Sequence, residues 1–211
     1  MNEISDIGPC FLVGPPRSGT TLLTAMLNTH SLVGAGPETH FFSKIKEDEW
    51  REMLADPDWP KKAVDKISSV KLVGQNVIGL FEISSEDLYD TLTNCERSIN
   101  AVLNGFFSIY LNKKGKSIWV EKTPNHLLFL DLIRKEFPKA KIIRIVRDPR
   151  DSCNSMSKLN WTYHPVSNAY IWNEWFEKSR VFLKTIIILF RLGMKILLVI
   201  LKSTYEEYVT S

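Results

Sequence analysis

Residues 10–21 read Cys-Phe-Leu-Val-Gly-Pro-Pro-Arg-Ser-Gly-Thr-Thr, an apolar run that stops at glycine and proline before a second apolar run, Leu22 to Leu27, begins. The first run, Cys10 to Val13, has no polar residue, which is typical of a strand buried on both faces of a parallel sheet. The second predicts a helix from about Gly19 to Asn28, packed on more than one face. A strand, a tight turn and a helix in this order direct backbone N–H groups and the positive end of the helix dipole at one point. The stretch therefore predicts an anion site suited to phosphate or sulfate.

The turn differs from a Walker loop at one position. Gly14 and Gly19 have the Walker separation, but Thr20 stands where the lysine belongs, and the basic residue is Arg17. Because that lysine reaches the β- and γ-phosphates, its loss argues against a site that grips a γ-phosphate with magnesium. No Walker-B aspartate follows a strand in the sequence, so we expect no metal. Two other interpretations of this turn stay open. The protein could be a small P-loop kinase, against which the missing lysine counts, or the turn could be purely structural and bind no ligand.

The same order of elements occurs twice more. Ser117 to Val120 predicts a short strand followed by a helix from Pro124 to Phe137, and Lys141 to Val146 predicts the clearest strand, followed by another helix. Thr123 and Asp148 stand at the N-cap positions, each before a proline at the first helical position. Three strand–loop–helix units predict an α/β fold of the P-loop NTPase-like type, with three layers and a central parallel sheet.

The remaining segments predict additions to this sheet. Residues 32–35 predict a short second strand that ends at Gly36, and residues 44–115 predict helices without strands, an insertion that packs on the sheet and shapes an acceptor pocket. Residues 161–184 predict a long aromatic helix, and the apolar segment 181–201 predicts the end of a helix, a turn near Gly193 and a strand over 195–201. We expect all 211 residues to form one domain.

Composition narrows the class of protein. A net charge of +3 is too small to indicate nucleic-acid binding, and the three widely spaced cysteines predict neither a disulfide framework nor a zinc site. They fit a reducing compartment, and the N-terminus lacks the pattern of a signal peptide, so we expect a cytoplasmic protein. The apolar segment 181–201 is interrupted by Lys184, Arg191 and Lys195, which a single transmembrane span tolerates poorly.

Two motifs resemble those of a known enzyme family. Pro16-Arg-Ser-Gly-Thr-Thr21 resembles the 5′-phosphosulfate loop of sulfotransferases that use 3′-phosphoadenosine 5′-phosphosulfate (PAPS). Val146-Arg-Asp-Pro-Arg-Asp-Ser-Cys-Asn-Ser155 resembles their 3′-phosphate motif, in which an arginine at a strand end and a serine eight positions later hold the 3′-phosphate. The resemblance implies that PAPS is the co-substrate and that its contacts come from Arg17, Ser18, Gly19, Thr20, Thr21, Arg147 and Ser155.

The likeness is greatest to the bacterial and tyrosylprotein branches of that family. Pro37-Glu38 resembles the position of their catalytic glutamate, and Glu121-Lys-Thr-Pro124 resembles their lysine turn. The resemblance implies that Glu38 takes the proton of an acceptor hydroxyl or amine, while Lys122 and Arg17 stabilise charge on the leaving group. His40 is the rival base, since the cytosolic branch uses histidine. The resemblance implies that the acceptor is a small molecule, a peptide or a glycan.

The end of the chain departs from the family pattern. Tyr205-Glu-Glu-Tyr208 resembles the start of a run that the family continues into a helix and a loop over the nucleotide, whereas this sequence stops at Ser211. We therefore expect a shortened or rearranged C-terminus, with self-association through residues 181–201 or slow turnover. A degenerate nucleotide-binding remnant without turnover is the second alternative.

Overall fold

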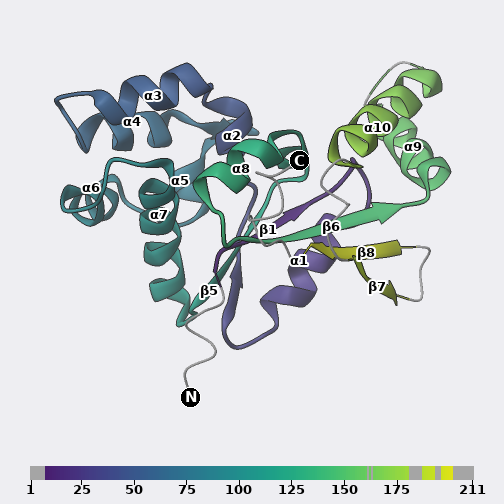
Figure 1. The fold of residues 1–211 in the computed structure, drawn as a ribbon, viewed down its shortest axis with the longest axis horizontal. Coiled ribbons are helices and arrows are strands. Elements are labelled where there is room, and N and C mark those ends of the chain that lie inside the picture. Colours follow the sequence, from purple (N-terminus) through teal and green to yellow (C-terminus); the bar gives the residue numbers. More distant parts are fainter. Residues whose placement is uncertain (1–7, 161, 163, 181–186, 193–195, 202–211) are drawn as a thin grey trace, which may run out of the picture.

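A computed structural model describes residues 8–160, 162, 164–180, 187–192 and 196–201 (Figure 1). Within these residues one six-stranded sheet has the order β2-β5-β1-β6-β8-β7. The strands β2, β5, β1 and β6 are parallel, and β8 and β7 continue the sheet in antiparallel fashion. The strands span Cys10–Val13 (β1), Val33–Ala35 (β2), Ile118–Lys122 (β5), Lys141–Arg147 (β6), Ile187–Leu192 (β7) and Ile196–Leu201 (β8).

The alternation of side chains along β1 divides the core into two layers. Phe11 and Val13 belong to the large core on the side of α7 (Ile99–Lys114), and Cys10 and Leu12 pack with Leu23 of α1 (Thr20–Asn28) on the other face. All four side chains are buried. The absence of polar residues from β1 is thus explained by apolar contacts on both of its faces. Helices cover both faces of the sheet, so the predicted three-layer α/β fold is confirmed.

The first helix is less deeply packed than the sequence predicted. Leu22 and Met26 remain 48% and 46% exposed, and the buried residues of α1 are Thr20, Leu23 and Thr24. The prediction of burial on more than one face is therefore wrong. The helix forms an outer layer and contacts the sheet along a single stripe.

The insertion after β2 is predominantly helical. Its helices are α2 (Phe41–Lys44), α3 (Glu47–Ala55), α4 (Lys61–Ser69), α5 (Val77–Leu80), α6 (Ser85–Thr93) and α7, and Figure 1 shows them gathered on the side away from α9 and α10. The prediction that this segment has no strands is wrong, because β3 (Lys71–Leu72) and β4 (Gln75–Asn76) form a small antiparallel hairpin. Val73 and Gly74 make its turn with φ angles of 49° and 84°, the geometry that a two-residue hairpin favours.

The helices after β5 and β6 begin at prolines, as predicted. A 3₁₀ helix, η1 (Pro124–Phe129), precedes α8 (Leu130–Glu136), and α9 (Pro149–Lys158) precedes α10 (Pro165–Arg180). The Asp148 side chain accepts a hydrogen bond from the N–H of Arg150 and so caps α9. Thr123 is the N-cap residue of η1, as predicted, but its side chain makes no capping bond, because its hydroxyl donates to the carboxylate of Glu121.

The structure confirms one part of the prediction for residues 181–201 and contradicts another. The predicted strand is confirmed as β8, whereas the end of a helix predicted before it is wrong, because Ile187–Leu192 forms β7 and pairs with β8. The helix predicted over 161–184 begins only at Pro165, because Thr162 and His164 are not helical. Residues 161, 163, 181–186, 193–195 and 202–211 lie outside the described residues, so the far end of that helix, the turn at Gly193 and the terminal run stay predictions. Among the described helices, none has the length and apolar character that spanning a membrane requires.

The four parallel strands end at the same edge of the sheet. Their carboxyl ends deliver residues 14–19 from β1, 36–40 from β2, 122–124 from β5 and 147–149 from β6. In open α/β sheets this edge is where ligands bind.

Candidate functional site

The loop between β1 and α1 has the features of an anion cradle. A Cβ at Gly14 would stand 2.4 Å from the carbonyl oxygen of Ile145, so the loop approaches β6 more closely than any other residue permits. Gly19, with a φ of 101°, is the N-cap of α1, and no side chain in the described part of the chain caps that helix. Its first N–H groups are therefore left for a ligand. The Ser18 hydroxyl is buried without a partner among the described residues, as expected of a group that awaits an anion.

Arg17 joins the two sequence motifs. It adopts a φ of 61°, which is uncommon for a residue other than glycine and is found at binding sites. Its Nε donates to the Ser155 hydroxyl on α9 at 3.0 Å, although 138 residues separate them. Arg147, at the end of β6, contacts Asp151 at 3.7 Å and is about one-third exposed. The predicted 5′ and 3′ binding residues therefore meet at one edge.

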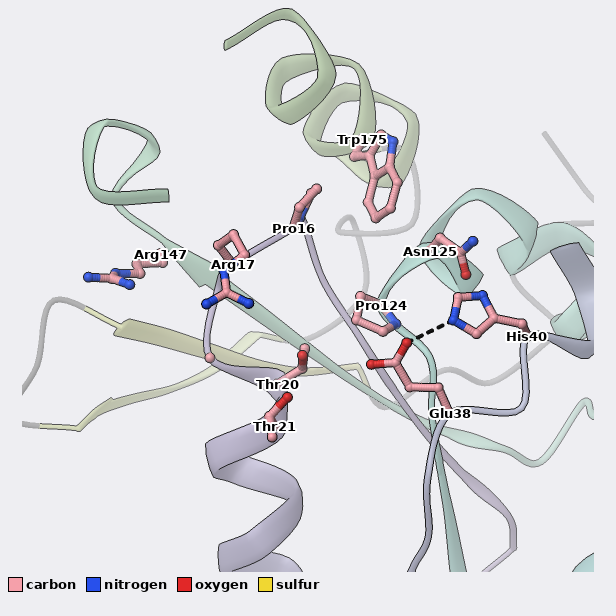
Figure 2. A pocket seen from close by; sticks show the side chains of 11 residues that line it. Pro16, Arg17, Thr20, Thr21, Glu38, His40, Pro124, Asn125, Arg147 and Trp175 are labelled. Atoms are coloured by element: carbon pink, nitrogen blue, oxygen red, sulfur yellow. Dashed lines mark hydrogen bonds and ion pairs between the residues drawn. The ribbon is translucent and has the colours of Figure 1, made fainter. Parts of the chain in front are cut away.

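A cavity of about 380 Å³ lies beside this contact. Figure 2 shows Thr20 and Thr21 at the start of α1 below Arg17, and Trp175 reaching down from α10 on the opposite side. The cavity is lined by Pro16, Arg17, Gly19, Thr20, Thr21, Glu38, His40, Pro124, Asn125, Arg147 and Trp175. Predicted binding residues and the predicted base thus share one cavity.

Glu38 is held by two basic partners. Lys122 Nζ donates to its Oε1 at 2.6 Å, and His40 Nε2 lies 2.8 Å from its Oε2. Burial alone would raise the pKa of Glu38, but the hydrogen bonds and charges of His40 and Lys122 outweigh it and lower the pKa to about 2. The carboxylate is therefore ionised in this arrangement, and the buried ammonium of Lys122 is neutralised by it.

The two candidate bases, Glu38 and His40, contact each other. His40 has a left-handed backbone, with a φ of 54°, and its Nδ1 lies 3.3 Å from the hydroxyl of Ser43. Because a carboxylate only accepts hydrogen bonds, the Nε2 that faces Glu38 carries a proton. In this state His40 orients Glu38 and is not itself free to accept a proton from a substrate at that nitrogen.

Four residues that line the cavity were not predicted as site residues: Trp175, Asn125, Pro16 and Pro124. Trp175 was one of several aromatics in a predicted helix, and nothing in the sequence distinguished it from core residues. Asn125 follows the lysine turn, and its Oδ1 is buried without a partner among the described residues. Both side chains face the cavity that holds Glu38.

A buried arginine fixes the helix that carries Trp175. Arg144, in the middle of β6, is 1% exposed, lies 4.7 Å from the ring of Phe176 and donates to the Phe176 carbonyl oxygen at 3.2 Å. Burial lowers its pKa to about 10, so it stays charged at neutral pH. This contact joins α10 to the central sheet beneath the cavity.

Comparison with known proteins agrees with this geometry. The model of the sulfotransferase family matches residues 9–184, more than half of the chain. The chain belongs to this family. The family resemblance drawn from the two motifs is thereby confirmed.

Among curated proteins, similarity extends to both branches named above. The nodulation protein NoeE of Sinorhizobium fredii is 26% identical over 160 residues, 74% of this chain and 33% of that protein. Protein-tyrosine sulfotransferase 1 of Danio rerio is 28% identical over 153 residues, 72% of this chain and 36% of that protein. The chain thus spans about a third of the length of these relatives.

Two solved structures share the fold. The sulfotransferase domain from the curacin biosynthetic pathway has a TM-score of 0.55 and 22% identity, covering 85% of this chain and 63% of that one. The sulfotransferase domain of the Synechococcus PCC 7002 olefin synthase has a TM-score of 0.51 and 19% identity, covering 81% and 59%. At these identities the likeness concerns the fold, which is the P-loop-like fold that the sequence predicted.

Proposed function

We propose that this chain transfers the sulfuryl group of PAPS to a hydroxyl or amine of an acceptor, with Glu38 as the general base. The observation that carries the proposal is the 3.0 Å contact between Arg17 and Ser155, which unites the residues for both ends of the donor. The family membership supports sulfuryl transfer in general. The donor, the base and the acceptor are the proposed part.

The residues of the cavity fit this donor. The uncapped start of α1 and the unpartnered hydroxyl of Ser18 would hold the phosphosulfate, because both offer donors to an anion. Arg147 and Ser155 would hold the 3′-phosphate, for which a charge-assisted bond from arginine is well suited. Arg17, which already touches Ser155, would reach toward both groups.

Sulfuryl transfer requires that Glu38 and Lys122 act in the same step. As the acceptor oxygen attacks sulfur, its proton passes to Glu38, and the bond between sulfur and the bridging oxygen breaks, leaving adenosine 3′,5′-bisphosphate. A pKa of about 2 makes Glu38 a weak base while Lys122 is bound to it. An ammonium that turns from Glu38 to the bridging oxygen would raise the pKa of the base and stabilise the leaving group at once. His40 would hold the carboxylate in place meanwhile.

The acceptor would enter beside Trp175. The indole and the rings of Pro16 and Pro124 form apolar parts of the cavity wall, next to the carboxylate of Glu38. A flat aromatic alcohol fits such a wall. Protein-tyrosine sulfotransferases are among the relatives, so a phenol is the first acceptor that we would test.

Incubation of the protein with PAPS and a panel of phenols, alcohols and amines, followed by mass spectrometry, tests the proposal. We expect a sulfated product and an equal amount of adenosine 3′,5′-bisphosphate. Nucleotide binding without any sulfated product would favour the degenerate remnant. Binding of ATP that requires magnesium would favour a kinase.

A further inference from the structure

We propose that Glu121 and Thr123 are positioning residues, which set the backbone that carries Glu38 and His40 through one buried hydrogen-bond network. This inference rests on the proposed function, since it concerns the base of that reaction. Neither residue lines the cavity. They act on the base through the backbone of the two residues that follow it.

The network begins at a buried carboxylate. Glu121 is 1% exposed, and its Oε1 accepts hydrogen bonds from the hydroxyls of Thr39 at 2.8 Å and Thr123 at 2.6 Å. Its Oε2 lies 2.8 Å from Nδ1 of His126, which is fully buried. Because the carboxylate only accepts, Nδ1 carries the proton. Three donors therefore hold one buried charge, which is the arrangement that keeps such a group ionised.

The carboxylate fixes the direction of the Thr123 hydroxyl. That hydroxyl has one proton, which it gives to Glu121, so both of its lone pairs face away from the carboxylate. They accept the backbone N–H groups of Thr39 at 3.1 Å and His40 at 3.2 Å. Every bonding position of the hydroxyl is thus used, and two successive amides of the segment after Glu38 are bound to one atom.

The segment that is held in this way carries the base. His40 has a left-handed backbone, which costs energy for a residue other than glycine and persists only where surrounding contacts impose it. Glu38 and His40 both line the cavity. Loss of the two amide contacts would release this turn and let the carboxylate of Glu38 move.

The end of β5 supplies both the buried carboxylate of Glu121 and the ammonium of Lys122 that binds Glu38. Successive side chains of a strand point to opposite faces, so Glu121 enters the core on the side of α7 while Lys122 points to the other face, where it binds Glu38. The three residues Glu121 to Thr123 therefore hold the base in two ways: through the backbone amides of the two residues that follow it, and through its own carboxylate.

A pair of substitutions at Thr123 separates positioning from stability. Thr123→Val keeps the shape and removes the hydroxyl, whereas Thr123→Ser keeps the hydroxyl. We expect the first to lower kcat about 10- to 100-fold with little change in KM, because a base displaced by about 1 Å loses roughly that much rate. The second should restore most of kcat. Glu121→Gln should lower kcat in the same direction, because the carboxamide replaces one accepting oxygen with a donor that faces the Nδ1–H of His126.

Two measurements report the result. The first is the formation of PAPS from adenosine 3′,5′-bisphosphate and p-nitrophenyl sulfate, which gives kcat and both KM values. The second is hydrogen exchange of the amides of Thr39 and His40, which should become several-fold faster in Thr123→Val while the exchange of the central strands stays unchanged. Tyr110→Phe is the control, because it removes another buried hydroxyl bond, to the carbonyl of Ala35, and should leave kcat and these two amides as they are.

The outcomes distinguish this inference from the function on which it rests. Wild-type kcat in Thr123→Val, an equal loss in Thr123→Ser, or unchanged exchange of the two amides would overturn the positioning role. If the unmodified protein binds the nucleotide and transfers nothing from p-nitrophenyl sulfate, the proposed function is contradicted for phenols. The exchange of the two amides then decides by itself whether Thr123 holds the segment.

Discussion

The Nε of Arg17 and the hydroxyl of Ser155 lie 3.0 Å apart, which joins a loop at the start of the chain to a helix 138 residues later. Both residues are predicted to hold the same nucleotide, at opposite ends. The contact therefore brings the residues proposed for the two ends of the donor together at one edge of the sheet. It also implies that Arg17 loses or shares this bond when a phosphate takes the place between them.

The first prediction concerns the nucleotide. Adenosine 3′,5′-bisphosphate should raise the melting temperature, because a ligand that binds only the native state stabilises it by about 2.7 kcal/mol at a hundredfold excess over Kd. AMP should do much less. Arg147→Ala should remove the difference between the two nucleotides, while Lys158→Ala, which removes one exposed charge from the last turn of α9, the helix after Arg147, should keep it. Equal shifts from both nucleotides in the unmodified protein would refute the 3′-phosphate site.

The second prediction assigns the base. Glu38→Gln should keep the binding of adenosine 3′,5′-bisphosphate and lower turnover at least about a hundredfold. His40→Ala should lower turnover less, because it removes the orienting bond at 2.8 Å and leaves the carboxylate in place. The larger loss in His40→Ala would transfer the role of base to the histidine. Lost nucleotide binding in Glu38→Gln would make Glu38 a structural residue.

The third prediction concerns pH. The folded-state pKa of Glu38, about 2, lies below the usual 4.5, so its contribution to stability is complete above about pH 4.5 and disappears as the pH falls towards 2. The difference in unfolding free energy between the wild-type protein and Glu38→Gln should therefore be constant above pH 5 and shrink between about 4.5 and 2. Urea unfolding at a series of pH values measures it. A difference that stays constant over this interval would mean that Glu38 has no such partners.

The fourth prediction tests the cradle. Gly14→Ala would place a Cβ 2.4 Å from the carbonyl oxygen of Ile145, so the loop or β6 must shift. We expect a loss of about 1–3 kcal/mol, typical of overpacking, together with weaker nucleotide binding. Gly105→Ala is the control, because its nearest atom is the flexible Leu92 side chain at 3.1 Å and alanine favours the helix. Unchanged nucleotide binding in Gly14→Ala would contradict the cradle.

The fifth prediction concerns the acceptor. Trp175→Ala should raise the KM for a phenol several-fold and leave the Kd of adenosine 3′,5′-bisphosphate unchanged, because the indole lies opposite Glu38 and away from Arg147 (Figure 2). Tyr170→Ala is the control, since that side chain is 71% exposed on the same helix. A KM that does not change would show that the acceptor lies elsewhere.

Local patterns were enough to predict the frame of the site. Each strand-to-helix turn, at Gly14, Lys122 and Arg147, is recognisable from a few consecutive residues. Because parallel strands end at the same edge of a sheet, the three turns are then expected to lie together. The network behind Glu38 could not be predicted, because Thr39 and Glu121 are 82 residues apart and no local pattern links the lysine turn to Thr39. The strand β7 was missed because an apolar run with isoleucines suits a helix end as well as a strand until its partner β8 is known.

Two expectations about the C-terminus stay predictions. Self-association through residues 181–201 involves β7 and β8 together with residues outside the described part of the chain, and the terminal run lies wholly outside it. Light scattering and a turnover assay test them together, because the expectation is self-association or slow turnover. A monomer that binds the nucleotide with micromolar affinity and turns over near the roughly 10 s⁻¹ enzyme median would contradict it.

Transfer of the sulfuryl group from isotopically labelled PAPS tests the central claim most directly. The protein and a phenol acceptor are incubated with PAPS that carries ³⁵S, and the labelled product is separated and counted alongside the same reaction with Glu38→Gln. We predict label in the phenol with the unmodified protein and at least about a hundredfold less with the variant. Equal transfer by both proteins, or label that stays in PAPS while the nucleotide binds, would contradict the account.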